Sequence, residues 1–202
     1  MIKLHGFSRS NYYSLVKAVL IERGIEFEEV NVTPSQDEDF LAISPMGKVP
    51  CLETESGFIS ESTAIIEYLE ETVSENSLLP TDAFQRAKVR ELLLHIELDI
   101  ELVARKAIMF AFGRDVKPEI IDQVQKELPR GAASLVRIAK FDPYIAGNEF
   151  TVADLAGYFS FGLASMIAKG AAGIDLFELV PGSKDWYEMI GERGAVKQAS
   201  GS

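Results

Sequence analysis

The N-terminal part of the chain alternates short runs that have the period of a strand with longer runs that have the period of a helix. Apolar and polar side chains alternate over residues 2–5, and residues 14–23 repeat apolar side chains at helical spacing before Gly24. The same pattern predicts further elements over residues 26–32, 37–43, 49–53, 58–59 and 62–75. Because their order is β-α-β-α-β-β-α, we expect a mixed four-stranded sheet with a parallel first pair and a later antiparallel hairpin.

Beyond residue 82 the apolar positions follow a helical period. A polar stretch over residues 77–82, with Pro80 inside it, is typical of a linker. Three helices are predicted after it, over residues 84–112, 118–140 and 151–169. Pro129 favours a kink or a break in the second helix. The pattern therefore predicts an α/β domain of residues 1–76 and an all-helical bundle domain of residues 83–202.

The composition narrows the class of protein. The 202 residues are 47% hydrophobic and 25% charged, which is ordinary for a globular chain with a sizeable core. The net charge of −11 disfavours a nucleic-acid partner, because phosphate binding needs clustered lysine and arginine. No apolar run reaches the ~20 residues that span a bilayer, and the N-terminus lacks the apolar core of a signal peptide. The one cysteine, Cys51, cannot form an internal disulfide, and we expect a cytoplasmic protein.

Four segments in order resemble the glutathione transferase superfamily. They are residues 8–17 (SRSNYYSLVK), 44–50 (SPMGKVP), 60–65 (SESTAI) and 144–155 (YIAGNEFTVADL). The chain looks like a serine-type, bacterial-like member, and the resemblance covers nearly its whole length. It implies a thioredoxin-like domain that binds glutathione, and a helical domain that lines a pocket for a small hydrophobic electrophile. It also implies a homodimer that detoxifies such compounds, with glutathione as co-substrate and without a metal.

The loop of residues 10–13 (SNYY) falls where redox members of the fold carry Cys-x-x-Cys. Ser10 replaces the first cysteine and Tyr13 the second, so the reactive thiol has to come from glutathione. A hydroxyl that donates a hydrogen bond to sulfur stabilises the thiolate, as does the positive end of a helix. We expect Ser10 to be this catalytic group, with Ser8 and then Tyr12 as alternatives. Ser10 is equally suited to capping the first helix.

The resemblance also assigns residues to glutathione binding. Pro50 matches a cis proline of the fold, which would let the backbone of Val49 pair with the cysteinyl part of glutathione. Ser62, at a helix N-terminus, would bind the γ-glutamyl carboxylate, and Glu61 would pair with the γ-glutamyl ammonium. Lys48 is a further expected contact, although a solvated lysine is equally typical of a turn. Without the resemblance, an acidic helix cap and a trans proline would be the simpler interpretations.

The electrophile pocket is expected between the domains. Fold analogy places Tyr12, Tyr13, Arg105 and Met109 there. Tyr12 stands where the zeta-type loop (SSCS) carries a cysteine, which disfavours maleylacetoacetate-type isomerisation. A glutathione-dependent isomerase or dehalogenase and a non-catalytic binding or scaffold module remain the alternative functions.

The remaining polar positions have structural interpretations. Thr151 and Asp154 have the spacing of a capping box, so losing the threonine hydroxyl should cost about 1 kcal/mol of stability. His5 and His95 have no partner at metal-ligand spacing. The charged side chains of the first long helix would face either a second copy of the chain or solvent; they are Glu91, Glu97, Asp99, Glu101, Arg105 and Lys106.

Overall fold

The computed structural model describes residues 1–201, which form two compact units. The first unit contains Met1–Leu79 together with the C-terminal segment from Glu192 onward, and the second contains Pro80–Gly191. The sequence placed that C-terminal segment in the helical domain, and the structure differs there. Along the described residues, no helix is both long enough and apolar enough to cross a bilayer.

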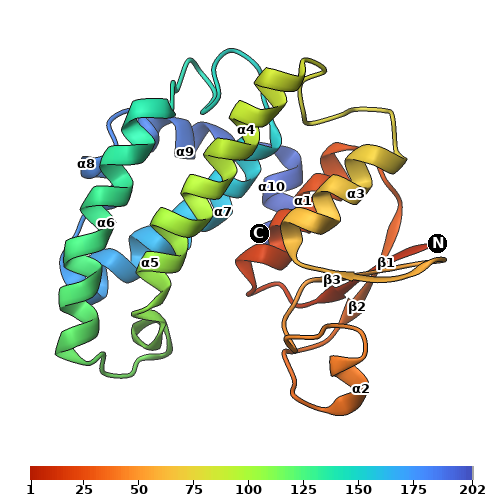
Figure 1. The fold of residues 1–202 in the computed structure, drawn as a ribbon, viewed down its shortest axis with the longest axis horizontal. Helices are drawn as coiled ribbons and strands as arrows, with labels where there is room; N and C mark the ends of the chain where they lie inside the picture. The colour runs from red at the N-terminus through yellow and green to blue at the C-terminus, as the bar shows by residue number, and fades with distance from the viewer. Residues whose placement is uncertain (202) are drawn as a thin grey trace. The chain divides into compact units, whose positions relative to one another are not determined.

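A four-stranded mixed sheet forms the centre of the first unit (Figure 1). Its strands are β1 (Ile2–Gly6), β2 (Phe27–Asn31), β3 (Cys51–Thr54) and β4 (Gly57–Ser60). They lie in the order β2-β1-β3-β4, with β1 parallel to β2 and antiparallel to β3, and with β3 and β4 as a hairpin. The predicted mixed sheet is therefore confirmed.

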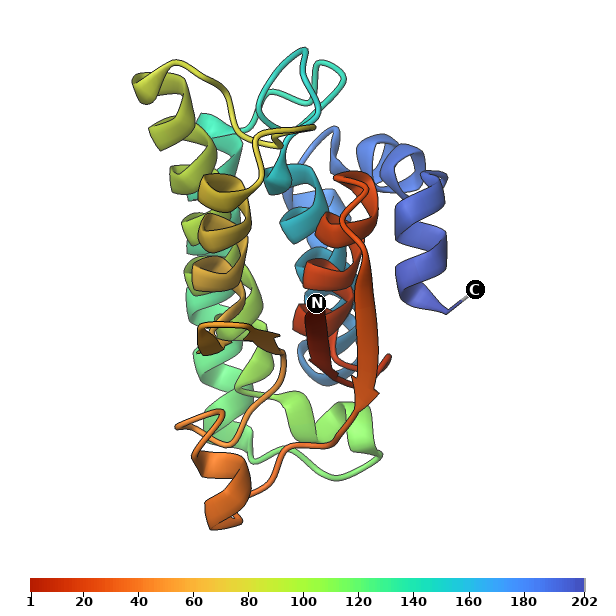
Figure 2. The same ribbon diagram turned by 90° about the vertical axis from the view of Figure 1, so that its right-hand side faces the viewer.

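Helices α1 (Asn11–Glu22) and α3 (Ser62–Thr72) lie side by side on one face of this sheet (Figure 2). The short α2 (Glu38–Leu41) lies below the sheet in Figure 1. The core between the layers is aliphatic and closed to solvent, with Leu4, Leu52, Ile65 and Leu69 all at 0% exposure. Burial of these side chains is the main force that joins the helices to the sheet.

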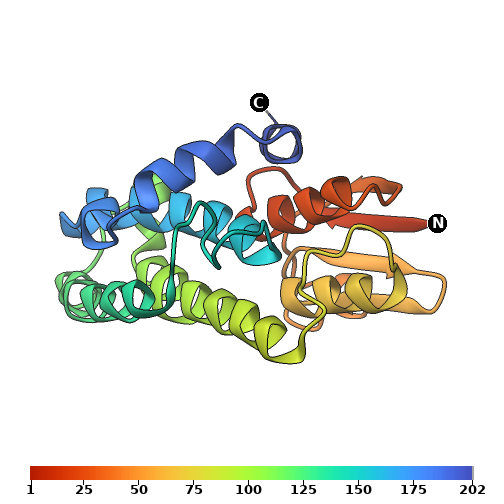
Figure 3. The same cartoon turned by 90° about the horizontal axis from the view of Figure 1, so that it is seen from above.

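The last helix, α10 (Gly194–Ser200), packs against α1 (Figure 3). Val196 and Ala199 are completely buried in this contact. Arg193 adds two hydrogen bonds to the Glu22 carboxylate, with Nε to Oε1 at 2.7 Å and Nη2 to Oε2 at 3.0 Å. This long-range pair explains why the C-terminal segment belongs to the first unit.

A buried ion pair closes the end of α1 and α3 away from their N-termini. The side chains of Arg23 and Glu70 are 0% and 1% exposed, and Nη1 lies 3.2 Å from Oε1. Arg23 also donates to the carbonyls of Val73 and Glu75, while Glu70 accepts from the Leu78 amide. The sequence pattern carried no signal of this network, because its members are far apart along the chain.

The regular elements of the second unit are helices. Its segments are α4 (Ala83–His95), the π-helical η1 (Ile96–Glu101), α5 (Leu102–Arg105), the 3-10 helical η2 (Ile108–Phe112), α6 (Pro118–Ile138), α7 (Val152–Ile167), the π-helical η3 (Ala168–Ala172), α8 (Leu176–Leu179) and α9 (Ser183–Gly191). The prediction of one regular helix over residues 84–112 is wrong, because a π segment interrupts it and Arg105 ends it. Glu101 lies inside that segment at 1% exposure, so it faces neither solvent nor a partner.

Helix α6 runs unbroken through Pro129, so a break at this residue is wrong, whereas the kink stays a prediction. Leu128 and Ala132, on either side of the proline, are buried and hold the helix in place. The helix also approaches η1 closely at Gly131, where a Cβ atom would lie 2.1 Å from the carbonyl oxygen of Asp99. Tertiary packing thus outweighs the local preference of proline.

Helix α7 is buried on nearly every side, and it begins at the predicted capping box. The Asp154 carboxylate accepts from the Thr151 amide at 2.8 Å, as the sequence indicated. It also accepts from the Ile145 amide and from Trp186 Nε1, each at 2.8 Å. Asp154 is therefore the polar centre of this unit, joining three segments of the chain.

Candidate functional site

The sheet topology brings three of the four sequence motifs to one edge. Because β1 and β3 are antiparallel, the chain leaves β1 beside the point where it enters β3, as the pairing of His5 with Cys51 shows. Cys51 also pairs with Ser60, the last residue of β4. The loop to α1, the turn before β3 and the start of α3 therefore lie at the same edge of the sheet.

Ser10 is the N-cap residue of α1. Its Oγ accepts from the Tyr13 amide at 3.3 Å, and its own amide donates to the Phe7 carbonyl at 3.0 Å. Among the described residues, the hydroxyl donates to no protein atom, so its proton is available to a ligand. The first turn of α1 carries only uncharged side chains (NYYS), so the turn holds no carboxylate of its own at the positive end of the helix.

The alternatives to Ser10 have less suitable positions. Ser8 is exposed, and its carbonyl accepts from Ser14 Oγ at 3.2 Å, but its side chain caps no helix. Tyr12 is half-buried in the first turn of α1. Of these three residues, Ser10 is the one whose hydroxyl lies at the end of the helix.

Tyr13 does not line a pocket, so that expectation is wrong. Its side chain is 2% exposed, and its phenol donates to Glu29 Oε2 at 2.5 Å. Burial is the main cause that raises the pKa of Tyr13, and the phenol stays protonated. Although burial opposes it, hydrogen bonds from Lys17 and Tyr13 hold the pKa of Glu29 below its usual range.

The other two residues expected at the electrophile pocket belong to the second unit. Arg105 Nε donates to the buried Glu101 carboxylate at 2.6 Å, so its guanidinium is already engaged. Met109 lies in η2 and is 38% exposed.

The turn before β3 contains a cis peptide bond between Val49 and Pro50. Both residues are buried, while Lys48 is exposed. Ser44, which the sequence did not single out, braces this turn: its Oγ donates to the Lys48 carbonyl at 2.7 Å and accepts from the Lys48 amide at 3.1 Å. The serine hydroxyl thereby fixes the backbone on which Val49 is presented.

Glu61 holds a strained backbone conformation at the start of α3. Its φ of 69° and ψ of 118° lie where side-chain-bearing residues rarely occur, which costs on the order of 1–3 kcal/mol. The side chain is exposed, whereas Ser62, the first residue of the helix, is 7% exposed. Retained strain of this kind is characteristic of functional sites.

The distribution of positive charge in the first unit points to the same edge. Of its seven lysine and arginine residues, five form ion pairs with carboxylates: Lys3, Lys17, Arg23, Arg193 and Lys197. Within the described residues, Arg9 and Lys48 form no such pair. Both belong to motif segments at the site, where they are available to an anionic ligand.

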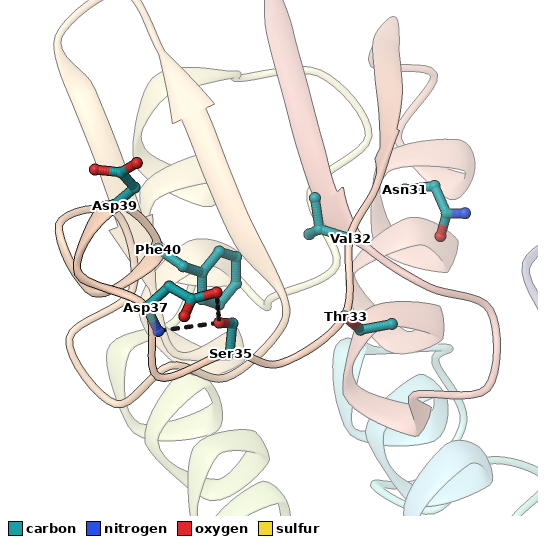
Figure 4. A pocket seen from close by; sticks show the side chains of 7 residues that line it. All are labelled: Asn31, Val32, Thr33, Ser35, Asp37, Asp39 and Phe40. Atoms are coloured by element: carbon teal, nitrogen blue, oxygen red, sulfur yellow. Dashed lines mark hydrogen bonds between the residues drawn. The ribbon is translucent and has the colours of Figure 1, made fainter.

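A shallow hollow opens beside the site loop, between β2 and α2 (Figure 4). It is lined by Asn31, Val32, Thr33, Ser35, Asp37, Asp39 and Phe40. The Val32 amide donates to the Gly6 carbonyl at 3.0 Å, which ties the start of the hollow to the end of β1. Among these lining residues, Ser35 Oγ donates a hydrogen bond to the Asp37 carboxylate at 2.7 Å. The sequence pattern did not indicate this hollow.

The single thiol of the chain lies in the core. Cys51 is completely buried, and its Sγ donates to the Ile43 carbonyl at 3.0 Å. Burial raises the pKa of this thiol to about 11. Among residues 1–201, no group of three or more His, Cys, Asp or Glu side chains is placed to hold a metal ion. His5 and His95 instead bond to Glu53 and Asp99.

Comparison with known proteins identifies the family. A family model described as the N-terminal domain of glutathione S-transferase matches residues 4–77. A glutathione S-transferase of Pseudomonas putida is 47% identical over 193 residues, covering 95% of this chain and 88% of that protein. A maleylacetoacetate isomerase of Rattus norvegicus is 30% identical, over 75% of this chain and 73% of its own.

The fold agrees with this relationship. A crystal structure of a Gtt2-class glutathione S-transferase of Vibrio parahaemolyticus has a TM-score of 0.78 and 26% identity, and the match covers 98% of this chain and 96% of that one. The mixed sheet with its flanking helices is the thioredoxin-like domain of such proteins, and the helical unit corresponds to their C-terminal region. The chain belongs to the cytosolic glutathione transferase superfamily.

Proposed function

We infer that this glutathione transferase uses the Ser10 hydroxyl to stabilise the thiolate of bound glutathione. The observation that carries this proposal is the hydrogen bond from the Tyr13 amide to Ser10 Oγ, which holds the hydroxyl oxygen at the N-terminus of α1 and leaves its proton to be donated. A free thiol with a pKa of ~8.5 is only a few per cent ionised at neutral pH. A donated hydrogen bond and the positive end of α1 both favour the anion.

The reaction that follows is a nucleophilic attack by sulfur. With a hydrophobic electrophile, the thiolate forms a carbon–sulfur bond, and the leaving group departs with its bonding electrons. With an organic peroxide, sulfur takes the terminal oxygen and an alkoxide leaves. The thiol proton passes to solvent in both cases. Serine needs no ionisation of its own for this role.

The edge of the sheet offers one contact for each part of glutathione. The backbone of Val49 would pair with the cysteinyl residue as an added strand does. Ser62, at the N-terminus of α3, would receive the γ-glutamyl carboxylate, and Glu61 the γ-glutamyl ammonium. Lys48 would meet the glycyl carboxylate. In the helical unit, Arg105 and Met109 remain the proposed electrophile contacts, together with Tyr12 of the first unit.

A second copy of the chain is the proposed protein partner. Leu94, Leu98 and Leu102 follow one another at helical spacing along α4, η1 and α5, and they are 46%, 53% and 39% exposed. Leucines repeated on one face are typical of a helix that packs against another protein. The single buried cysteine suits a reducing cytoplasm, where we propose that the homodimer works.

The test is conjugation of glutathione to a chloronitrobenzene by the wild type, Ser10→Ala and Ser8→Ala. We expect Ser10→Ala to lose at least ~10-fold in rate, which is about 1.4 kcal/mol of barrier. Ser8→Ala should keep near-normal activity. Equal losses in the two variants would contradict the assignment of Ser10.

A specialised isomerase is the second candidate, because one relative is named a maleylacetoacetate isomerase. It predicts a wild type that binds glutathione, leaves the chloronitrobenzene unreacted and isomerises a cis-unsaturated diketo acid. Absence of glutathione binding would contradict both functions.

A further inference from the structure

We propose that Tyr13 is a positioning residue for the Ser10 hydroxyl: its phenol, bonded to Glu29 of β2, holds the first turn of α1 on the sheet, while its amide orients the Ser10 oxygen. The proposal rests on the proposed role of Ser10. Tyr13 itself does not touch the reacting atoms, since its ring is buried on the sheet side of the helix.

The ring of Tyr13 occupies space that exists only because residue 6 is glycine. A Cβ atom on Gly6 would lie 2.2 Å from Tyr13 Cδ2, far inside van der Waals contact. The phenol therefore passes over the last residue of β1 and reaches Glu29 on the neighbouring strand. Glu29 is itself fixed by the sheet, because it pairs with Leu4 in the parallel ladder.

One carboxylate on β2 thus secures two successive turns of α1. Lys17, four residues after Tyr13, also donates to Glu29, at 2.8 Å, and its side chain is 13% exposed. These two bonds oppose sliding and rotation of α1 on the sheet. They therefore help to set the height of its first turn, and with it the position of the N-cap residue.

The link from this anchor to the site is a single hydrogen bond. The Tyr13 amide donates to Ser10 Oγ at 3.3 Å, so the residue that anchors the helix also holds the hydroxyl oxygen in place. Hydrogen bonds to a developing anion are sensitive to sub-ångström displacement. Loosening the phenol should therefore weaken the stabilisation of the thiolate without removing any group that contacts glutathione.

Tyr13→Phe tests the proposal, because it removes one hydroxyl and keeps the ring. We expect kcat to fall about three- to tenfold, with less than a twofold change in the KM for glutathione. We also expect the pKa of the bound glutathione thiol, followed by the ultraviolet absorbance of the thiolate, to rise towards that of the free peptide. A merely structural role would lower stability and leave this titration unchanged.

Tyr187→Phe is the matched control. Tyr187 is a half-buried tyrosine of the second unit, stacked on Tyr158 with the ring centroids 4.4 Å apart. Loss of its hydroxyl should lower stability to a comparable degree and leave the thiolate titration at the wild-type value. A shift in this control equal to that of Tyr13→Phe would overturn the proposal.

A double-mutant cycle with Glu29 separates the anchor from general damage. Glu29→Gln keeps an acceptor for the phenol and should retain most of the activity, whereas Glu29→Ala also removes the bond to Lys17 and should lose at least as much as Tyr13→Phe. The double variant Tyr13→Phe/Glu29→Ala should be no worse than Glu29→Ala alone, because the phenol has already lost its acceptor there. Additive losses, or a Tyr13→Phe enzyme that titrates like the wild type, would overturn the proposal.

The two claims fail in different ways. If Ser10→Ala binds no glutathione thiolate and Tyr13→Phe binds as much thiolate as the wild type, only the role of Tyr13 is overturned. A wild type that binds glutathione entirely as the thiol at neutral pH overturns the role of Ser10, and the role of Tyr13 with it.

Discussion

Polar side chains serve opposite purposes in the two units. In the helical unit, the completely buried Asp154 accepts hydrogen bonds from three separate segments of the chain, so its capacity is used inside the protein. At the sheet edge of the first unit, and counting the described residues, the Ser10 hydroxyl donates to no protein atom and Lys48 forms no ion pair with a carboxylate. Glu61 has a strained backbone conformation there. Satisfied polar groups stabilise a fold, whereas unsatisfied ones held in place mark a binding site.

The largest expected effect follows from removing Asp154, the polar group whose hydrogen bonds are all made inside the protein. Asp154→Ala leaves the donors of Ile145, Thr151 and Trp186 without an acceptor in a buried position, which should cost about 4 kcal/mol of the free energy of unfolding. Urea denaturation measures this loss. The variant that still folds should bind glutathione normally. A loss below about 1 kcal/mol would show that Asp154 is not the polar centre described here.

Removing the charge of Lys48 should change the binding of glutathione and leave kcat unaffected. Lys48→Met is expected to raise the KM for glutathione about three- to tenfold, with kcat unchanged, because the lost contact stabilises ground state and transition state equally. Added salt should weaken glutathione binding in the wild type more than in the variant. Arg9→Met is the matched variant, since it removes the other unpaired cation of the unit. If Lys48→Met has the KM of the wild type for glutathione, Lys48 does not contact glutathione and is a solvated lysine of the turn.

Replacing the strained residue Glu61 by glycine should raise the stability of the fold and lower the affinity for glutathione. Glu61→Gly removes the conformational penalty, so the free energy of unfolding should rise by up to about 1 kcal/mol while the affinity for glutathione falls. Glu61→Gln is the control that keeps the strain and removes only the charge. It should lose affinity without a gain in stability. A Glu61→Gly variant that is less stable than the wild type would mean that the conformation carries no strain.

The smallest expected effect concerns Cys51. Because burial raises the pKa of its thiol to about 11, the folded protein should react with a disulfide reagent at pH 8 only as fast as it unfolds. The sign follows from the thiol: the unfolded chain ionises near pH 8.5 and the folded one only near pH 11, so this group makes folding less favourable as pH rises through that interval. Rapid reaction without denaturant would contradict the buried position.

Local patterns in the sequence were sufficient for the sheet, the capping box and the motif segments. Alternation over residues 2–5 and the helical spacing that follows Ser10 depend only on neighbours, and the structure contains both elements. The family resemblance added the cis bond before Pro50, which base rates alone would not have favoured.

Features that depend on distant partners could not be predicted in this way. The bond from Tyr13 to Glu29 requires the register of β1 and β2, and the pair of Arg23 with Glu70 requires the packing of α1 on α3. The same reason explains the C-terminal helix, whose Arg193 reaches Glu22 at the other end of the chain. The family resemblance named the residues proposed for the site, but not those that hold them in place.

The central claim is that the Ser10 hydroxyl, fixed at the end of α1, lowers the pKa of the glutathione thiol. The most direct measurement is the ultraviolet titration of the thiolate in the complexes of glutathione with the wild type and with Ser10→Ala. We predict a wild-type thiol pKa well below the ~8.5 of a free thiol, and a value near that of the free peptide in Ser10→Ala. Identical titrations in the two proteins would contradict the account.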